Sequence, residues 1–413
     1  MGEVPADQLP PAGEPRQAAL VFIFITVLLD MLALGIIIPV WPRLVVGLLS
    51  GDSARGAEIF GVFGTAWALM QFVFSPIQGA LSDRFGRRPV ILLSNLGEGL
   101  DYFVMALAPS LGWLLVGRVV SGATAASVST AFAYIADVTP PEKRAGRFGM
   151  VGAAFGIGFV LGPAIGGLLG ELGPRLPFWF AGVLGLANFA YGFFVLPESL
   201  PIERRAAFRW RRANPVGALG LLRSHRELSG LAVIYFLSQL AHVVLPSTFV
   251  LYAGFRYGWT ERAVGLTLAA VGVCSMVVQA GLVGRVVAWA GECRTLMIGL
   301  FFGALGFAIY GLAPTGRWFV LGVPVMSLWG LASPASQGLM TRLVSGSEQG
   351  QLQGASSSMM GIAGLLGPTL FTLTFAYAIT ATHHWQLSGA PFLLAALLLT
   401  LALGLTYRMA QRG

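Results

Sequence analysis

Three acidic residues and one arginine stand inside long apolar runs of this sequence. Asp30 lies in the first run, and Glu98 and Asp101 lie three residues apart in a later one. Arg118 follows in the next run. A charge within such a run is costly and marks a functional site by default. A carboxyl group there holds a proton when desolvated and loses it beside an arginine, so it can exchange protons as its access to water changes. We therefore predict that these four residues couple a process to proton movement.

Three of these residues also have a purely structural interpretation. Asp30 would serve as a hydrogen-bond partner in a kinked helix. Glu98 would face a watery vestibule, and Arg118 would extend its charged end towards the membrane surface. Asp101 has the strongest functional case, either in coupling or in recognising the charge of a substrate.

Other reactive side chains are few. His242 is the only histidine within an apolar run; the near-neutral pKa of an unperturbed histidine suits proton exchange, although a hydrogen-bonded packing role explains it equally well. Cys274 and Cys293 are the only cysteines, and they make no case for a disulfide framework. We find no metal-ligand cluster and no nucleophile–base constellation. We therefore predict no metal, no cofactor other than a proton gradient, and no enzyme.

The runs that carry these residues are long enough to cross a membrane. The chain is 56% hydrophobic and 11% charged, against roughly 25% charged residues in a soluble domain. Barrel strands are excluded because they need only about half the observed run length. We predict an all-α integral membrane protein with twelve spanning helices at 19–40, 57–81, 89–109, 112–136, 148–171, 176–197, 229–254, 262–288, 294–313, 317–341, 353–378 and 388–409.

The runs form two groups of six. We predict the following parts: a tail (1–18), a first six-helix bundle (19–197), an Arg-rich linker (198–228), a second bundle (229–409) and a short tail (410–413). Basic residues gather in alternate loops, on the same side of the membrane as the N-terminus. Because such loops stay in the cytoplasm, we expect both termini there. The expected location is the inner (plasma) membrane of the cell. Because the arginines lie in short loops between spans, the net charge of +8 indicates a lipid bilayer rather than nucleic acid as partner. We expect a monomer.

The two groups resemble each other at an offset of about 205 residues. This offset places Gly117 on Gly322, Asp137 on Arg342, and Gly162-Pro163 on Gly367-Pro368. Chance matching among glycine-rich helices is the alternative. Two parallel repeats of six helices around a central cavity are typical of transporters.

The loop between the second and third runs reads GALSDRFGRRP (79–89). Gly79 would let the end of the second helix pack closely against a neighbour. Asp83 is an anion that a helix N-terminus would stabilise, and Gly86 allows a tight turn. Arg84, Arg87 and Arg88 would hold the loop in the cytoplasm. A solvated basic loop is the simpler interpretation, but this ordered combination of residues is far more specific.

The loop resembles the signature loop of the major facilitator superfamily. The fifth run carries GAAFGIGFVLGPAIGG (152–167), including Gly158, Gly162 and Pro163, and resembles the antiporter motif of the drug/proton exchangers in that superfamily. Within that superfamily, the sequence most resembles the bacterial tetracycline/proton antiporters, the TetA-type exporters. It covers almost the whole chain and rests on ALMQ (68–71), SDRFGRRPV (82–90), GLDY (99–102), IADVTPPEKR (135–144) and LQGASSS (352–358).

The resemblance implies two bundles that rock around a central site, exchanging proton entry for drug exit. It implies that Asp83 contacts the start of helix eleven, near Gly350–Gly354, and that Arg87 pairs with Asp137. Together these contacts would latch the cytoplasmic side in the outward-facing state. The second half keeps only a degraded copy of the loop around Gly281, Arg285 and Gly291, so the latch is expected to be asymmetric.

The resemblance also implies roles for residues within the spans. It matches Asp30, Asp101 and Arg118 with charged residues of the TetA-type pattern, whereas Glu98 stands where those proteins usually have a small residue. It places Gln71 and Gln279 at positions associated with drug contact. Gln71, Asp101, His242 and Gln279 are thus the predicted substrate-binding residues.

Two departures from that pattern bear on the substrate. Helix nine, at 294–313, has no acidic residue, and Ser275 stands where the pattern has a histidine in helix eight. Both departures weaken the case for tetracycline and leave proton coupling to the first half. We predict a secondary active transporter that exports an amphiphilic drug-like molecule, with a tetracycline-like antibiotic as one option, in exchange for protons by alternating access. The alternative is a facilitator-type carrier for a metabolite or lipid-like molecule without drug export; a receptor or an enzyme on this scaffold is a third hypothesis.

Overall fold

The computed structural model describes residues 14–125, 127–205, 220–221, 226–345, 348–380 and 387–411. Much of the predicted linker (206–219 and 222–225), most of the N-terminal tail (1–13) and the last two residues (412–413) lie outside the described residues. Every backbone N–H and C=O group in a lipid bilayer needs an internal partner, and an α-helix supplies one within the same segment. The apolar runs accordingly fold as helices.

The described part of the first half holds eight helices. They are α1 (Glu14–Ile37), α2 (Trp41–Gly47), α3 (Ser53–Phe85), α4 (Arg87–Leu107), α5 (Leu111–Thr124), α6 (Ser127–Val138), α7 (Pro141–Leu172) and α8 (Leu176–Val195), followed by the 3-10 turn η2 (Ile202–Arg204). Asp52 begins α3 by accepting a hydrogen bond from the N–H of Arg55 at 3.0 Å, which satisfies one of the free amides of the first turn.

The second half repeats this layout with more interruptions. Its elements are α10 (Arg226–His242), α11 (Val244–Tyr257), α12 (Glu261–Val277), the π-helical turn η5 (Val278–Leu282), α13 (Val283–Leu312), α14 (Gly316–Ser327), the 3-10 turn η6 (Leu328–Leu331), α15 (Ala332–Arg342), α16 (Gln349–Ile379) and α17 (Ala390–Ala410). Gly258 ends α11 with φ 63°, a left-handed conformation that favours glycine.

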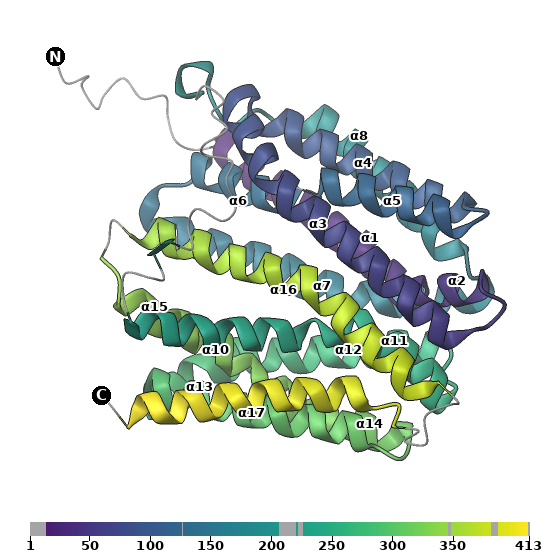
Figure 1. The fold of residues 1–413 in the computed structure, drawn as a ribbon. Helices are drawn as coiled ribbons and strands as arrows, with labels where there is room; N and C mark the ends of the chain where they lie inside the picture. The colour runs from purple at the N-terminus through teal and green to yellow at the C-terminus, as the bar shows by residue number, and fades with distance from the viewer. Residues whose placement is uncertain are drawn as a thin grey trace.

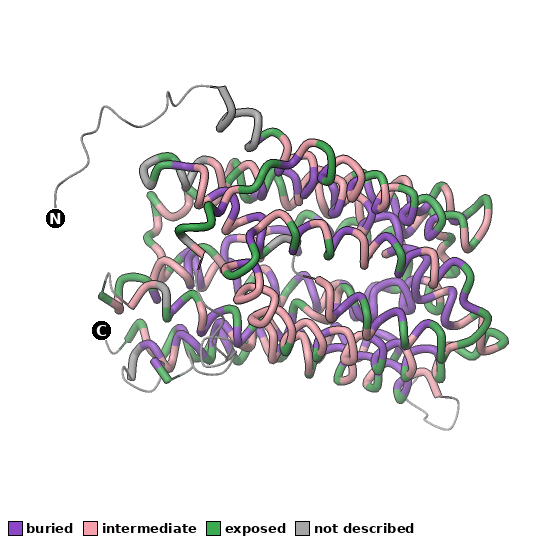
Figure 2. Tube along the Cα trace, turned by 90° about the horizontal axis from the view of Figure 1, so that it is seen from above, coloured by how far each residue is buried: buried purple, intermediate pink, exposed green. Residues whose placement is uncertain are grey.

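Eleven helical stretches in the described part of the chain are long and apolar enough to cross a membrane. The longest, Glu261–Leu312, contains Gly291 at φ 75° and ψ 166°, which interrupts the helix between the predicted spans 262–288 and 294–313. Exposed residues lie along the outside of the bundles (Figure 2). They include large apolar ones within the spans, such as Phe194 at 82% and Leu321 at 66% exposure, as expected for surfaces that contact lipid. The prediction of an all-α, multi-pass membrane protein is confirmed.

The helices gather into two bundles (Figure 1). α1 begins and α17 ends at the same end of the bundles, which we call the near end; the opposite end, where α3 begins, is the far end. α3 of the first bundle packs on α16 of the second, and α7 packs on α12. The helices of these two pairs, which the repeat relates to each other, form the contact between the halves.

The contact between the halves is tightest towards the far end. A Cβ atom added at Gly64 of α3 would lie 2.9 Å from Pro368 of α16. At the next residue, the hydroxyl of Thr65 donates to the carbonyl oxygen of Leu365 at 3.1 Å and lies 2.8 Å from the hydroxyl of Thr369. Small residues permit this close approach of two backbones within a membrane.

The two halves separate towards the near end. A Cβ at Gly79 of α3 would meet no heavy atom of the described residues within 4 Å. The expectation that Gly79 packs closely against a neighbouring helix is therefore wrong for this state of the protein. The physical reason is that α3 has already diverged from α16 at this level, beyond the contacts around Gly64 and Thr65.

Candidate functional site

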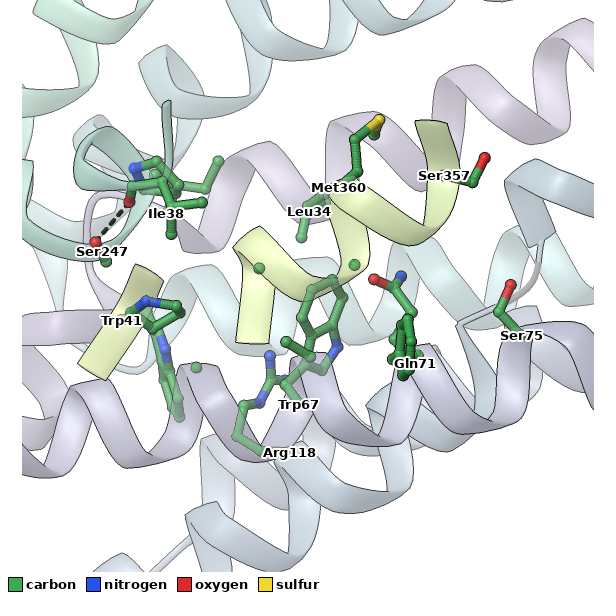
Figure 3. A pocket seen from close by; sticks show the side chains of 18 of the residues that line it. Leu34, Ile38, Trp41, Trp67, Gln71, Ser75, Arg118, Ser247, Ser357 and Met360 are labelled. Atoms are coloured by element: carbon green, nitrogen blue, oxygen red, sulfur yellow. Dashed lines mark hydrogen bonds between the residues drawn. The ribbon is translucent and has the colours of Figure 1, made fainter. Parts of the chain in front are cut away.

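A cavity of about 760 Å³ lies between the two halves (Figure 3). Its walls come from α1, α2, α3, α5 and α7 of the first half and from α11 and α16 of the second. Arg118, Trp67 and Gln71 project from one side, and Met360 of α16 lies across from them. A cavity of this size and position suits a drug-sized ligand.

The lining is mostly apolar and aromatic. Its aromatic rings belong to Trp41, Phe60, Trp67, Phe72 and Phe159. Its neutral polar groups belong to Gln71, Ser75, Ser247, Ser357 and Ser358. Arg118 is the one charged side chain among the described lining residues. Such a wall binds apolar surface broadly and uses a few polar groups to orient a ligand.

Arg118 and Asp101 form a buried ion pair at this wall. Nη2 of Arg118 on α5 donates to Oδ2 of Asp101 on α4, and the two residues are 8% and 3% exposed. The same nitrogen lies 2.9 Å from the sulfur of Met105, and the guanidinium lies 4.9 Å from the ring of Trp41. The glycine at position 117 is required, because a Cβ there would overlap Oδ1 of Asp101. Arg118 is therefore held inside the protein rather than extended to the membrane surface.

Asp30 is buried on α1 and held by a residue that the sequence had not pointed to. Nδ2 of Asn188, on α8, donates to Oδ1 of Asp30 at 2.7 Å and to the carbonyl oxygen of Thr26 at 2.9 Å. Asp30 is 4% exposed and Asn188 is fully buried. Only the packing of α8 on α1 brings the two together, so no local pattern could have revealed the pair.

Glu98 completes the cluster of charges. It is half-buried on α4, one turn before Asp101, and interacts electrostatically with Asp30, Asp101 and Arg118. The structure therefore brings together all four residues predicted to couple protons, from α1, α4 and α5 of the first half. Arg118 alone among them lines the cavity, so Asp101, which pairs with it, is linked to the cavity through the guanidinium.

The predicted substrate-binding residues are dispersed. Gln71 lines the cavity, whereas His242 and Gln279 do not. His242 is the last residue of α10 and lies 5.5 Å, ring to ring, from Trp329; Gln279 is exposed in η5. Which face of a helix meets a cavity depends on its rotation in the bundle. The similar string LQGASSS did contain Ser357 and Ser358, but nothing in it showed that they would face the cavity.

The signature loop folds as a network inside the first half. Nε of Arg87 donates to Oδ2 of Asp137 at 3.0 Å, and its Nη1 donates to Oδ1 of Asp83 at 2.6 Å. The expected pairing of Arg87 with Asp137 is present. No hydrogen bond or ion pair joins Asp83 to the part of α16 that the structure describes. Arg84 lies over the ring of Phe85, 5.1 Å from its centre, and Arg88 donates to the carbonyl oxygen of Phe193.

A different carboxylate occupies the helix N-terminus at this loop. Asp83 lies in the last turn of α3, and its contact with the start of helix eleven in the outward-facing state stays a prediction. Oε1 of Glu198 accepts from the N–H of Arg87 at 2.9 Å, and its Oε2 accepts from the N–H of Arg88 at 3.3 Å. Glu198 thereby satisfies the free amides that begin α4. Gly86 turns the chain here with φ 109°, as the expected tight turn requires.

The antiporter motif supports close packing of three helices. A Cβ at Gly162 of α7 would lie 2.7 Å from Cα of Gly35 on α1, and one at Gly158 would lie 2.5 Å from Cβ of Met31. Pro163 lies within α7, and its carbonyl oxygen faces Gly265 of α12 in the other half. The motif thus places α7 tightly between α1 and α12, where the two halves meet.

A set of polar contacts that sequence reasoning missed joins the halves at the far end. Nη1 of Arg43, on α2, lies 2.7 Å from Oε1 of Glu261, the first residue of α12. Glu171, at the end of α7, accepts from the hydroxyl of Thr260 at 3.3 Å and lies 4.0 Å from Arg262. The partners in each contact stand far apart in the sequence, and only the assembled fold pairs them.

The chain is similar to known transporters over nearly its whole length. Residues 23–368 match the family model of the Major Facilitator Superfamily. The chain is 37% identical to the class C tetracycline resistance protein of Escherichia coli, over 91% of this chain and 94% of that one. It is 34% identical to the class B protein of Escherichia coli, over 92% and 94% of the two chains. The crystal structure of a human organic anion transporter aligns with a TM-score of 0.70 at 25% identity, over 95% of this chain and 99% of that one. The chain therefore belongs to the Major Facilitator Superfamily, a family of membrane transporters rather than enzymes.

Proposed function

We propose that this transporter exports an amphiphilic drug-like molecule in exchange for protons. The observation that carries the proposal is the ion pair of Arg118 and Asp101 at the wall of a cavity shared by both halves. A carboxylate that a guanidinium holds ionised takes up a proton when that guanidinium is drawn away. The side chain of Arg118 would thereby couple binding of a ligand in the cavity to protonation of the acids.

The cavity supports an amphiphile as the substrate. Aromatic and aliphatic side chains provide most of its surface, and a few hydroxyl and amide groups provide hydrogen bonds. Tetracycline-like antibiotics fit this description, and the tetracycline resistance proteins named above support their inclusion among the candidates. Gln71 and Arg118 are the residues we expect to orient the ligand, while Glu98, Asp101 and Asp30 carry protons.

The arrangement of the two ends supports alternating access. The contacts around Thr65 and the ion pair of Arg43 with Glu261 close the far end, and the cavity extends towards the near end as far as Ser75 and Gly354. We propose that the near end faces the cytoplasm, with both termini there and the protein in the inner (plasma) membrane as a monomer. This state would then admit substrate from the cytoplasm. The parts at 1–18, 19–197, 198–228, 229–409 and 410–413 stay predictions.

Transport in vesicles tests the proposal. The purified chain in liposomes that are acidic inside is given labelled tetracycline, and a panel of labelled amphiphiles, from outside. Outflow of protons should drive accumulation of at least one compound, and Asp101→Asn should reduce that accumulation at least tenfold. The matched control is Glu203→Gln, which removes an exposed acid of η2 far along the chain from the cluster.

A second variant guards against a folding defect. Asp101→Asn leaves Arg118 buried without its charge partner, which is destabilising. Glu98→Gln breaks no ion pair among the described residues and should also reduce gradient-driven uptake. Uptake of the labelled compound that does not depend on the pH gradient and is unchanged in both variants would identify a facilitator-type carrier. It would refute proton exchange.

A further inference from the structure

Asn188 holds the carboxyl group of Asp30 through a geometry that permits only one assignment. Its Nδ2 contacts two oxygens, Oδ1 of Asp30 at 2.7 Å and the carbonyl oxygen of Thr26 at 2.9 Å. A carbonyl oxygen can only accept a hydrogen bond. The amide group must therefore point its nitrogen at Thr26, and the same nitrogen then donates to Asp30.

The consequence concerns where Asp30 can carry a proton. Oδ1 of Asp30 accepts from Asn188, and the carbonyl oxygen of a protonated carboxyl group is a better acceptor than its hydroxyl oxygen. A proton on this carboxyl group is therefore expected on Oδ2. A donated hydrogen bond also stabilises the ionised form of a carboxyl group over the neutral form. We propose that Asn188 is a positioning residue for Asp30, which it holds in one orientation and biases towards releasing its proton.

The surroundings explain why such a bias is needed. Asp30 is 4% exposed, so its carboxyl group depends on protein donors rather than water for hydrogen bonds. α4 brings two further acids, Glu98 and Asp101, and Tyr102 to this region, and the cation that α5 brings, Arg118, donates to Asp101. α8 has no ionisable group besides Tyr191, and α7 carries charges only near its ends, away from its contact with α1 around Gly158 and Gly162. Asn188 is thus a neutral hydrogen-bond donor to Asp30 in a region that holds three acids and one cation already paired with Asp101.

The unused half of the amide agrees with this role. Oδ1 of Asn188 is buried without a hydrogen-bond partner among the described residues, and so is the hydroxyl oxygen of Thr26. A polar side chain that served only packing would cost free energy by leaving its acceptor unsatisfied, and an apolar residue of similar size would avoid that cost. The presence of an amide at position 188 is explained if the site requires its two donated hydrogen bonds.

The inference rests on the proposed part of Asp30 in proton exchange, but its test needs no transport. The full-length chain in lipid is titrated with acid while infrared spectra are recorded, and the carboxyl C=O band that Asp30→Asn removes reports protonated Asp30. In Asn188→Leu this band should persist to a pH about one unit higher than in the parent, a tenfold gain in proton affinity. Asn188→Gln, which keeps the amide, should recover part of the shift.

Asn95→Leu is the matched control. Asn95 is buried on α4 at 1% exposure, and neither polar atom of its amide has a partner in the described structure. The same chemical change there should leave the band of Asp30 at the parent pH. An equal shift in Asn95→Leu, or a midpoint unchanged in Asn188→Leu, overturns the inference.

Two further outcomes are decided in advance. If Asn188→Leu does not fold, Asn188→Ala decides, because it removes the donor without adding volume or a second ionisable group and should move the band in the same direction. A band of Asp30 absent from the parent and from every Asn188 variant at all pH values also overturns the inference. If the protein shows no proton-coupled transport but the band shifts as expected, the proposed function is refuted and the positioning role of Asn188 still holds.

Discussion

Glu292 and Arg342 form an ion pair that repeats the pair of Arg87 and Asp137 with the charges reversed. Oε1 of Glu292, on α13, lies 3.0 Å from Nη2 of Arg342 at the end of α15. Both residues stand 205 positions after their counterparts, and Gly291 has a positive φ at the position that matches Gly86. The second half therefore keeps the turn and the pair of the signature loop, although its sequence motif is degraded.

The two pairs differ in burial, so their loss should differ in effect. The side chain of Arg87 is 11% exposed and bridges two carboxylates, whereas that of Arg342 is 73% exposed. Breaking a largely buried pair leaves an uncompensated charge, while an exposed pair contributes little. We expect Arg87→Gln to destabilise the protein by about 2–3 kcal/mol and Arg342→Gln by less than about 1 kcal/mol. Thermal unfolding of the purified chain in detergent checks this, and equal losses would contradict it.

Gly86 should not accept a side chain. Its φ of 109° is unfavourable for other residues, and an added Cβ would overlap the carboxylate of Glu198. Gly86→Ala is expected to destabilise the protein by about 2 kcal/mol or more, measured as a fall in the melting temperature. Gly79→Ala is the control, since its Cβ would meet no heavy atom within 4 Å. An unchanged melting temperature in Gly86→Ala would refute the requirement for glycine in this turn.

The pair of Arg43 and Glu261 should hold the far end closed. Their side chains are 31% and 16% exposed, and a half-exposed pair of this kind contributes about 1 kcal/mol or less. Losing it in Arg43→Gln should raise the population open at the far end up to about fivefold. Distances between spin labels at Arg55→Cys and Arg317→Cys, in a chain without its two natural cysteines, report that population.

A charge swap provides the control for the far end. Arg43→Glu combined with Glu261→Arg restores opposite charges and should return the distance distribution to that of the parent. A distribution that stays the same in Arg43→Gln, or that the swap fails to restore, would show that the ion pair does not bias the state of the transporter.

Gly162 should be intolerant of any larger residue. It lies where α7 crosses α1, and a Cβ there would be 2.7 Å from Cα of Gly35. A larger side chain at this position would push the backbones of α1 and α7 apart and would also disturb the contact of α7 with α12. Gly162→Val is therefore expected to abolish folding or to lower the melting temperature by more than any other variant above. Gly152→Val, in the same helix but in open space, is the matched control. Size-exclusion profiles of the two variants check the expectation.

The sequence by itself determined the features that depend on local composition. Apolar runs of spanning length predict helices because backbone groups in lipid need internal partners. The turn at Gly86 could be predicted because glycine tolerates the conformation that the turn needs, and the pairing of Arg87 with Asp137 followed from a resemblance carried by neighbouring residues. The same holds for the gathering of acids in the first half, since Glu98 and Asp101 are one turn apart on one helix.

Only the tertiary structure decided which distant residues meet. Asn188 reaches Asp30, Glu198 accepts from the amides that begin α4, and Arg43 pairs with Glu261, because of the way whole helices pack, rotate and end. The same rotation turned Gln71 into the cavity and left His242 and Gln279 out of its lining. Hydropathy states that a helix is buried in the membrane but not which of its faces is turned inward, because every face of a spanning helix is largely apolar. Contacts between helices, not the pattern along any one of them, select the partners of the few polar groups inside.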